Sequence, residues 1–191
     1  MAGWFRERRH RYIDGVDSEL VAAVGNQLQR LRFTVDPEVA DHSYVVGHLS
    51  YYIASHLHFS RDVGRAAYVV GSLHEVGRLI VPEVNEREAF SLGQAAYRLR
   101  YAQVALASFD ILAEDDMLRP YAPGILEFYA EPAELSLPVR TAIVANAFDV
   151  YGNTETPAAT LRYLRQNPSL DQAIIGGLES MLFSKQAVMS A

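Results

Sequence analysis

The sequence predicts an all-α fold, a bundle of about seven helices. Apolar residues recur at three- and four-residue spacing along most of the chain, as they do along the buried face of a helix. No stretch of the sequence shows the clear apolar–polar alternation that indicates a strand. The chain has 191 residues, of which 50% are hydrophobic, so it is long enough for a core of its own. We therefore expect a single domain over residues 1–191.

The first three helices are indicated by their apolar spacing and by the residues that precede them. Asp17 stands ahead of a leading helix within residues 17–35. Asp36 and Pro37 stand ahead of the second helix, and Ser60 stands ahead of the third. Asp and Ser cap the first turn of a helix, and Pro is tolerated there. The repeating apolar positions are Leu20, Val24, Leu28 and Leu31, then Val46, Leu49, Ile53 and Leu57, then Val63, Ala67, Val70 and Leu73.

Four further helices are expected in the second half of the chain. Residues 91–116 have the pattern of one long helix, and residues 137–151 that of a largely buried helix. Two shorter helices follow at 157–168 and 169–183. Residues 118–138 are expected to be rich in loops, because proline inside a helix removes a hydrogen bond. The prolines of this segment are Pro120, Pro123, Pro132 and Pro138.

The composition excludes several classes of function. Without cysteine the chain has no disulfide, no zinc–thiolate site and no thiol nucleophile, so a metal would need histidine, carboxylate, amide or water ligands. A net charge of −6 argues against a general nucleic-acid binder, because phosphate backbones attract cationic surfaces. No apolar run approaches the ~18 residues of a membrane span, and the basic arm at residues 1–16 lacks the apolar centre of a secretory signal. We therefore expect a cytoplasmic protein.

The stretch LHEVGRLIVPE, residues 73–83, ends an apolar helical run and places His74 beside Glu75. Neighbours on a helix lie about 100° apart, so both side chains can lean toward one ion if another element supplies a third ligand. His42 is the candidate, because the face of its helix carries apolar residues and points to the core. The short link HFSRD, residues 58–62, would join antiparallel helices and bring His42 near His74. The alternative is a pair of core histidines with satisfied hydrogen bonds.

Three segments together resemble one family. They are HSYVVGHL at residues 42–49, SLHEVGRLIVP at 72–82 and LPVRTAIVANAFDVYGNTETP at 137–157. In this order and at nearly this spacing they are similar to the HD superfamily of metal-dependent phosphohydrolases, and specifically to its HD-GYP branch, whose active members hydrolyse cyclic-di-GMP. The resemblance implies an HD-domain helical bundle with its core at residues 36–155 and C-terminal helices at 156–191.

The resemblance also implies where a divalent metal, Fe, Mn, Zn or Mg, would bind. Glu75 stands for the aspartate of the family's His-Asp pair, and Asn146 stands for a ligating aspartate. Arg78 stands for a lysine, and its guanidinium could meet a phosphate. If the site is active, Glu75 and Arg78 are the candidate catalytic residues. The implied metal ligands are His42, His74, Glu75, Asn146 and Asp149.

Other expected ligands are missing from the sequence. All six histidines lie within the first 74 residues, whereas the family takes further histidine ligands from its fourth helix and from the loop after it. Tyr101 stands near the first of these places, and residues 119–138 contain neither histidine nor the Gly-Tyr-Pro signature. We therefore do not expect a multinuclear centre. Three of the other four histidines are expected to be structural or exposed: His48, His56 and His58.

The favoured hypothesis is a degenerate HD-GYP-like domain that lacks cyclic-di-GMP phosphodiesterase activity and has a regulatory, signalling or binding role. One alternative is a mononuclear metal-dependent phosphohydrolase that acts on a nucleotide or a phosphomonoester. Another alternative is a purely structural helical scaffold. The expected partner is another protein or a second copy of the chain, and a nucleotide or cyclic dinucleotide is a further candidate ligand.

Overall fold

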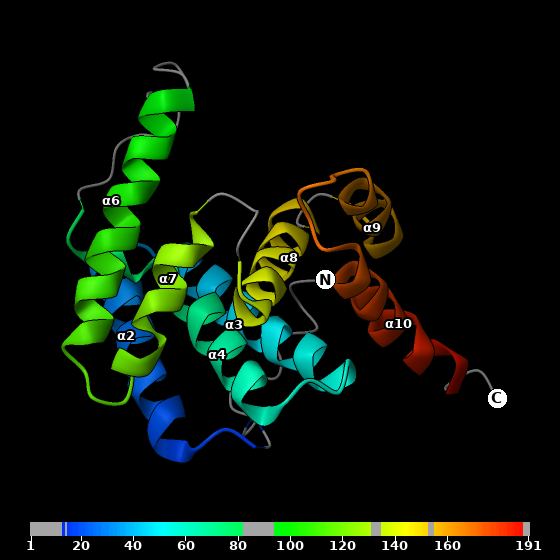
Figure 1. The fold of residues 1–191 in the computed structure, drawn as a ribbon, viewed down its shortest axis with the longest axis horizontal. Helices are drawn as coiled ribbons and strands as arrows, with labels where there is room; N and C mark the ends of the chain where they lie inside the picture. Colours follow the sequence, from blue (N-terminus) through cyan, green and yellow to red (C-terminus); the bar gives the residue numbers. More distant parts are fainter. Residues whose placement is uncertain (1–12, 14, 82–93, 131–134, 153–154, 189–191) are drawn as a thin grey trace.

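The computed structural model is all-α, as the sequence predicts (Figure 1). Over the part of the chain that it describes, it contains eight α-helices, one more than expected, and two short 3-10 helices. The described residues are 13, 15–81, 94–130, 135–152 and 155–188. The helices are α2 (Ser18–Thr34), α3 (Pro37–His56), α4 (Arg61–Leu73), η1 (Val76–Leu79), α6 (Gln94–Ala113), η2 (Arg119–Tyr121), α7 (Ala122–Phe128), α8 (Leu137–Gly152), α9 (Pro157–Arg165) and α10 (Gln172–Val188). Most of the expected basic arm, residues 1–12 and 14, lies outside the described residues.

The helix starts follow the capping residues seen in the sequence. The side chain of Asp36 accepts a hydrogen bond from the backbone N–H of Glu38, just ahead of α3. The side chain of Ser60 accepts one from the N–H of Val63 at the start of α4. Each cap satisfies a backbone donor that the helix itself leaves unpaired. The predicted beginnings of α3 and α4 are therefore confirmed.

The additional helix lies in the segment expected to be rich in loops. Pro120 begins the short helix η2 and Pro123 begins α7, each within the first two positions of its helix. At those positions the missing N–H of proline has no partner to lose, and its fixed φ already suits a helix. The expectation of a loop-rich segment at 118–138 was wrong for its first half, because these prolines start helices instead of breaking them.

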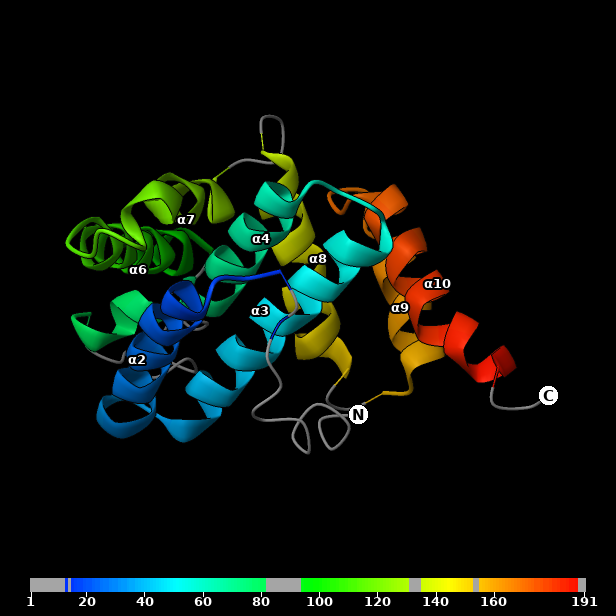
Figure 2. The ribbon, with the colours of Figure 1, turned by 90° about the horizontal axis from the view of Figure 1, so that it is seen from below.

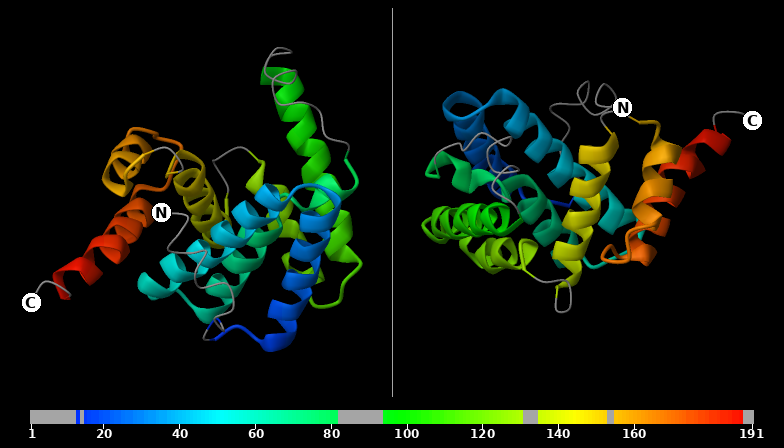
Figure 3. Two further views of the ribbon diagram at one scale, coloured as in Figure 1. Left: turned by 180° about the vertical axis from the view of Figure 1, so that it is seen from behind. Right: turned by 90° about the horizontal axis from the view of Figure 1, so that it is seen from above.

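Helices α3, α4 and α8 form the centre of the molecule. They pack against one another, with α6 and α7 on one side and α9 and α10 on the other (Figure 2). Helix α2 lies against α3 and α4, and the N-terminal part of α6 extends beyond its neighbours (Figure 3, left). The start of α3 lies beside the end of α4, where the rings of His42 and His74 meet. Helix α8 lies beside the start of α3 through the hydrogen bond between Asp149 and His42.

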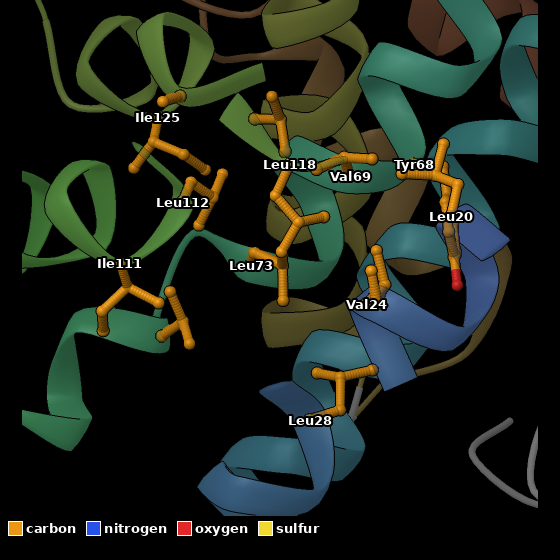
Figure 4. Close-up of a cluster of buried hydrophobic side chains, with 14 of the residues drawn as sticks. Leu20, Val24, Leu28, Tyr68, Val69, Leu73, Ile111, Leu112, Leu118 and Ile125 are labelled. Carbon is orange, nitrogen blue, oxygen red and sulfur yellow. The ribbon is translucent and has the colours of Figure 1, made fainter. Parts of the chain in front are cut away.

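Two apolar clusters hold these layers together. The larger one joins α2, α4, α6 and α7, and Leu73 at the end of α4 is fully buried within it (Figure 4). The smaller one joins α3 and α8 to α9 and α10, with Phe148 among its buried side chains. Because α3 and α4 must come close to bridge both clusters, Gly47 is required on α3: a Cβ there would meet the Ser72 Oγ at 1.8 Å.

None of the described helices combines the length and the apolar character that a membrane crossing requires. This finding agrees with the absence of a long apolar run in the sequence.

Candidate metal centre

The structure brings His42, His74 and Glu75 together. His42 lies on α3, His74 directly follows the last residue of α4, and Glu75 precedes η1. One potential ligand atom from each lies within 4.8 Å of the other two. The two imidazole rings meet edge to face, with centroids 5.4 Å apart. The pairing of α3 and α4 therefore places His42 beside His74, as the short link between the two helices indicates.

The backbone conformation that brings His74 and Glu75 together differs from the continuous helix expected from the sequence. His74 and Glu75 are not consecutive positions on one helix, because α4 ends at Leu73 and Glu75 has φ −104° and ψ 5°. The chain turns there toward α6. Gly77 allows η1 to approach α6 closely, since a Cβ at that position would meet the Val104 carbonyl oxygen at 2.1 Å. The two side chains converge through this turn rather than through the spacing of a helix.

Each histidine has one ring nitrogen engaged. The Nδ1 of His74 donates to the Gly71 carbonyl at 2.8 Å. The Nδ1 of His42 lies 2.7 Å from the carboxylate of Asp149 on α8. Backbone carbonyls and carboxylates in these positions fix the tautomer of a ligating histidine and orient its ring. The Nε2 of each ring is not engaged by these two contacts, although the side chain of Asn146 also bonds to the His42 ring.

The two histidines differ in their affinity for protons. Burial lowers the pKa of His74 to about 4, despite the opposing charge of Glu75. Burial on its own would also lower the pKa of His42, but the hydrogen bond to Asp149 and the charge of Glu75 outweigh it and raise that pKa. Neutral imidazole is the ligand form, so His74 is ready to bind near neutral pH, whereas an ion at His42 competes with a proton.

Glu75 is paired with a cation of the chain itself. Its Oε1 accepts a hydrogen bond from the Arg78 guanidinium at 2.7 Å, and the two side chains are only 10% and 12% exposed. Burial alone would lower the pKa of Arg78, but the charge and hydrogen bond of Glu75, together with Tyr101 and Tyr129, outweigh burial and raise that pKa. Arg78 therefore remains charged, and it lies on the carboxylate instead of extending toward solvent.

Aromatic side chains cover the side of His74 that faces α7. The ring of Phe128 lies 4.7 Å from the His74 ring. The Tyr129 hydroxyl donates to the His74 carbonyl oxygen at 2.9 Å, and the Tyr129 ring stacks on Tyr101 of α6 at 5.4 Å. Tyr101 thus lies beside the cluster, near where the resemblance would require a further histidine.

The other two implied ligands, Asn146 and Asp149, both lie on α8 and both interact with His42. Asp149 makes the hydrogen bond described above, and the side chain of Asn146 also hydrogen-bonds to His42. Asp149 does not join the group of three mutually close ligand atoms. Asp149 orients the His42 ring. Asn146 and Asp149 therefore contact the cluster through His42.

The other three histidines that the structure describes are separate from the cluster. His48 is buried and its Nδ1 bonds to the Tyr44 carbonyl at 2.9 Å. His56 lies 3.1 Å from the Ser180 hydroxyl of α10, and His58 is exposed with φ 56°. These placements agree with their interpretation as structural or exposed residues.

Three residues of the site were missed by sequence reasoning. Ser108 of α6 accepts the N–H of Gly77 at 2.7 Å and donates to the His74 carbonyl at 3.4 Å. Phe128 and Tyr129 form the aromatic cover. The spacing of apolar residues could not identify them, because their role depends on how α6 and α7 fold back onto η1.

The one group of close ligand atoms among the described residues fits a single divalent ion. His42, His74 and Glu75 can supply two nitrogens and a carboxylate oxygen, which suit iron, manganese or zinc. An ion with bonds of about 2.1 Å holds its ligand atoms closer together than the present limit of 4.8 Å. Binding of an ion would therefore draw the three ligand atoms closer together.

No protein-family model matches this chain, and neither a curated protein nor a solved structure does. The interpretation of the cluster therefore rests on its motifs and its geometry.

Proposed function

We propose that this chain is a degenerate HD-GYP-like domain without cyclic-di-GMP phosphodiesterase activity, and that it has a regulatory or binding role. The observation that carries the proposal is the surroundings of His74. Phe128, Tyr129 and Tyr101 gather there, and none of them supplies the imidazole nitrogen that a further histidine would offer to a second ion. Hydrolysis of a phosphodiester by such a centre needs metal ions that polarise the phosphate and activate water.

The core elements that would form a binding domain are nevertheless intact. Helices α3, α4 and α8 pack closely, and both histidines retain partners that orient them. Loss of ligands with retention of the fold favours a role in binding over one in catalysis. The ligand or partner is expected to be a protein, a nucleotide or a cyclic dinucleotide.

The first experiment measures turnover of cyclic-di-GMP with manganese, iron or magnesium, beside an active phosphodiesterase as a positive control. We expect no product with any of the three metals. Sustained turnover with one of them would overturn the proposal.

A thermal-shift panel of cyclic dinucleotides and ordinary nucleotides tests the binding role. A ligand present at about 100 times its dissociation constant stabilises the folded state by about 2.7 kcal/mol. A shift with one compound identifies the ligand class, and no shift with any compound directs the search to protein partners.

One observation favours a second candidate, a mononuclear phosphohydrolase. His42, His74 and Glu75 are close enough for one ion, and each imidazole has its Nδ1 fixed. A bound divalent ion would polarise a phosphoryl group and lower the pKa of a coordinated water. The chain would contribute the orientation of both rings through Asp149 and the Gly71 carbonyl.

The second candidate is tested with a His74→Ala variant in a phosphatase screen that covers nucleotides and phosphomonoesters. The control is His56→Ala, because the His56 side chain bonds to α10 and lies outside the cluster. Activity that disappears in His74→Ala and persists in His56→Ala would support the candidate. Activity that is equal in both variants would exclude this site.

A further inference from the structure

We propose that Arg78 acts as a built-in cation of the cluster: its guanidinium holds Glu75 and keeps a divalent metal ion from binding at His42, His74 and Glu75. This inference deepens the proposed function and rests on it, because it names a residue of the cluster that opposes metal-dependent hydrolysis. It concerns affinity for an ion, so it can be tested separately from any reaction.

The first support is the geometry of the pair. The guanidinium lies 2.7 Å from the Glu75 Oε1, and the backbone N–H of Arg78 also donates to the Glu75 carbonyl oxygen at 3.0 Å. The same short turn therefore fixes the two residues through both side chain and backbone. A carboxylate held in this way is already neutralised and already has a hydrogen-bond donor.

The second support is the burial of the pair. Glu75 and Arg78 side chains are 10% and 12% exposed, so water replaces neither partner easily. Opening a buried ion pair leaves an uncompensated charge, which is strongly unfavourable. A metal ion would have to overcome this loss before it gained Glu75 as a ligand.

The third support is the position of two tyrosines. Tyr101 and Tyr129 both interact electrostatically with Arg78, and Tyr129 is anchored to the His74 carbonyl. Their rings stack on each other, so they limit the directions in which the arginine can withdraw. Any ion at the cluster would consequently have the guanidinium as a close neighbour of the same sign.

Arginine is well suited to this role. Its planar guanidinium matches a carboxylate, and it stays protonated when buried. A neutral side chain at residue 78 would leave Glu75 free to join the two Nε2 atoms. The prediction is that removal of the charge at this one position creates affinity for a metal without any new ligand.

The test is a Co²⁺ titration of the full chain, free of any histidine tag, followed by the absorption of the bound ion. The proteins are the wild type, Arg78→Met and Arg78→Gln, whose amide can still donate to Glu75. The matched control is Arg119→Met, because Arg119 pairs with the exposed Asp116 at 2.7 Å. Circular dichroism verifies that each variant is folded, and Arg78→Gln carries the test if Arg78→Met does not fold.

We expect one Co²⁺ per chain in the Arg78 variants, bound at least about tenfold more tightly than by the wild type, since Coulomb repulsion from a neighbouring cation is removed. Arg119→Met should behave as the wild type. Adding His74→Ala to the Arg78 variant should abolish the gain.

Three results would overturn the inference. They are wild-type binding as tight as that of the variants and dependent on His74, folded Arg78 variants that gain no affinity, and a gain that survives His74→Ala. Failure of the proposed function would be recognised differently, as cyclic-di-GMP turnover by the wild type. The two ideas can therefore fail independently.

Discussion

The two sides of the metal-ligand cluster differ in burial and in the kind of partner that holds them. On the inner side, His74 is 2% exposed and is held by the backbone of Gly71, by aromatic rings and by the turn that leads to Arg78. On the outer side, the side chains of His42 and Asp149 are 20% and 15% exposed, and they hold each other. The inner side is thus built into the core, whereas the outer side depends on side-chain contacts between two helices, α3 and α8.

Two histidines that face the same point can therefore have pKa values shifted in opposite directions. Burial lowers the pKa of His74 to about 4, whereas the carboxylates of Asp149 and Glu75 outweigh burial and raise the pKa of His42. Changes on the inner side should therefore affect stability most, and changes on the outer side should mainly affect protonation.

The largest effect is expected when the inner ion pair is broken. Arg78→Met leaves the Glu75 carboxylate buried and uncompensated, which costs about 3–5 kcal/mol of unfolding free energy. The double variant Glu75→Gln/Arg78→Met removes both charges and should lose much less. Urea denaturation of the wild type and both variants measures the difference. A single variant as stable as the double would show that the pair is solvated and that the inner side is not rigid.

The second prediction concerns acid. Burial lowers the pKa of His74 and of His48 to about 4, below the ordinary value of about 6.5. The unfolded chain then binds more protons than the folded one, so stability is complete above about pH 6.5 and falls as the pH decreases toward about 4. Each histidine accounts for about 3 kcal/mol at the acid end of this window.

His48→Gln isolates one part of that effect. Its unfolding free energy should fall less between neutral pH and about pH 4.5 than that of the wild type, because one buried histidine no longer has to become protonated. Denaturation curves at both pH values provide the measurement. An unchanged pH dependence would mean that His48 already accepts a proton in the folded state.

The third prediction concerns the turn at Gly77, on the inner side of the cluster. Ser108→Ala removes the acceptor of the buried Gly77 N–H and should destabilise the fold by about 1–3 kcal/mol. Ser55→Ala, at an exposed position of α3, is the control and should have little effect. Thermal unfolding of the two variants compares them, and equal losses would contradict a special role for the Ser108 hydroxyl.

The smallest effect is expected on the outer side. Asp149→Asn removes the charge that helps to raise the pKa of His42, so that pKa should fall. A raised histidine pKa stabilises the fold below its ordinary value, and this contribution is lost as the pH rises through the folded value. The variant should therefore lose stability under mildly acidic conditions and little at alkaline pH. An NMR titration of the His42 ring checks the pKa, and an unshifted value would mean that Asp149 does not control it.

The sequence was sufficient for the fold class and for the proximity of His42 to His74. Both depend on local signals, since Asp36 and Ser60 mark helix starts and a short link reverses the chain. The helical character of the segment at Pro120 and Pro123 was not foreseen, because a proline that begins a helix and one that breaks it look alike in sequence. The packing of the residues after each proline decides between the two outcomes.

The inner wall of the site could not be read from the sequence at all. Ser108 and Tyr129 reach His74 from positions 34 and 55 residues away in the chain. Their contacts exist only because η1, α6 and α7 fold onto one another. Likewise, the sequence shows an arginine three residues after Glu75, but only the fold shows that both are buried and paired.

The close contact of η1 with α6 couples the position of α6 to the positions of His74 and Glu75. At Gly77 the two backbones meet with no side chain between them: a Cβ there would lie 2.1 Å from the carbonyl oxygen of Val104. No flexible side chain can absorb a displacement at such a contact. The other end of α6 extends beyond the body of the molecule (Figure 1). A tilt of α6 would be transmitted to the turn that carries His74 and Glu75.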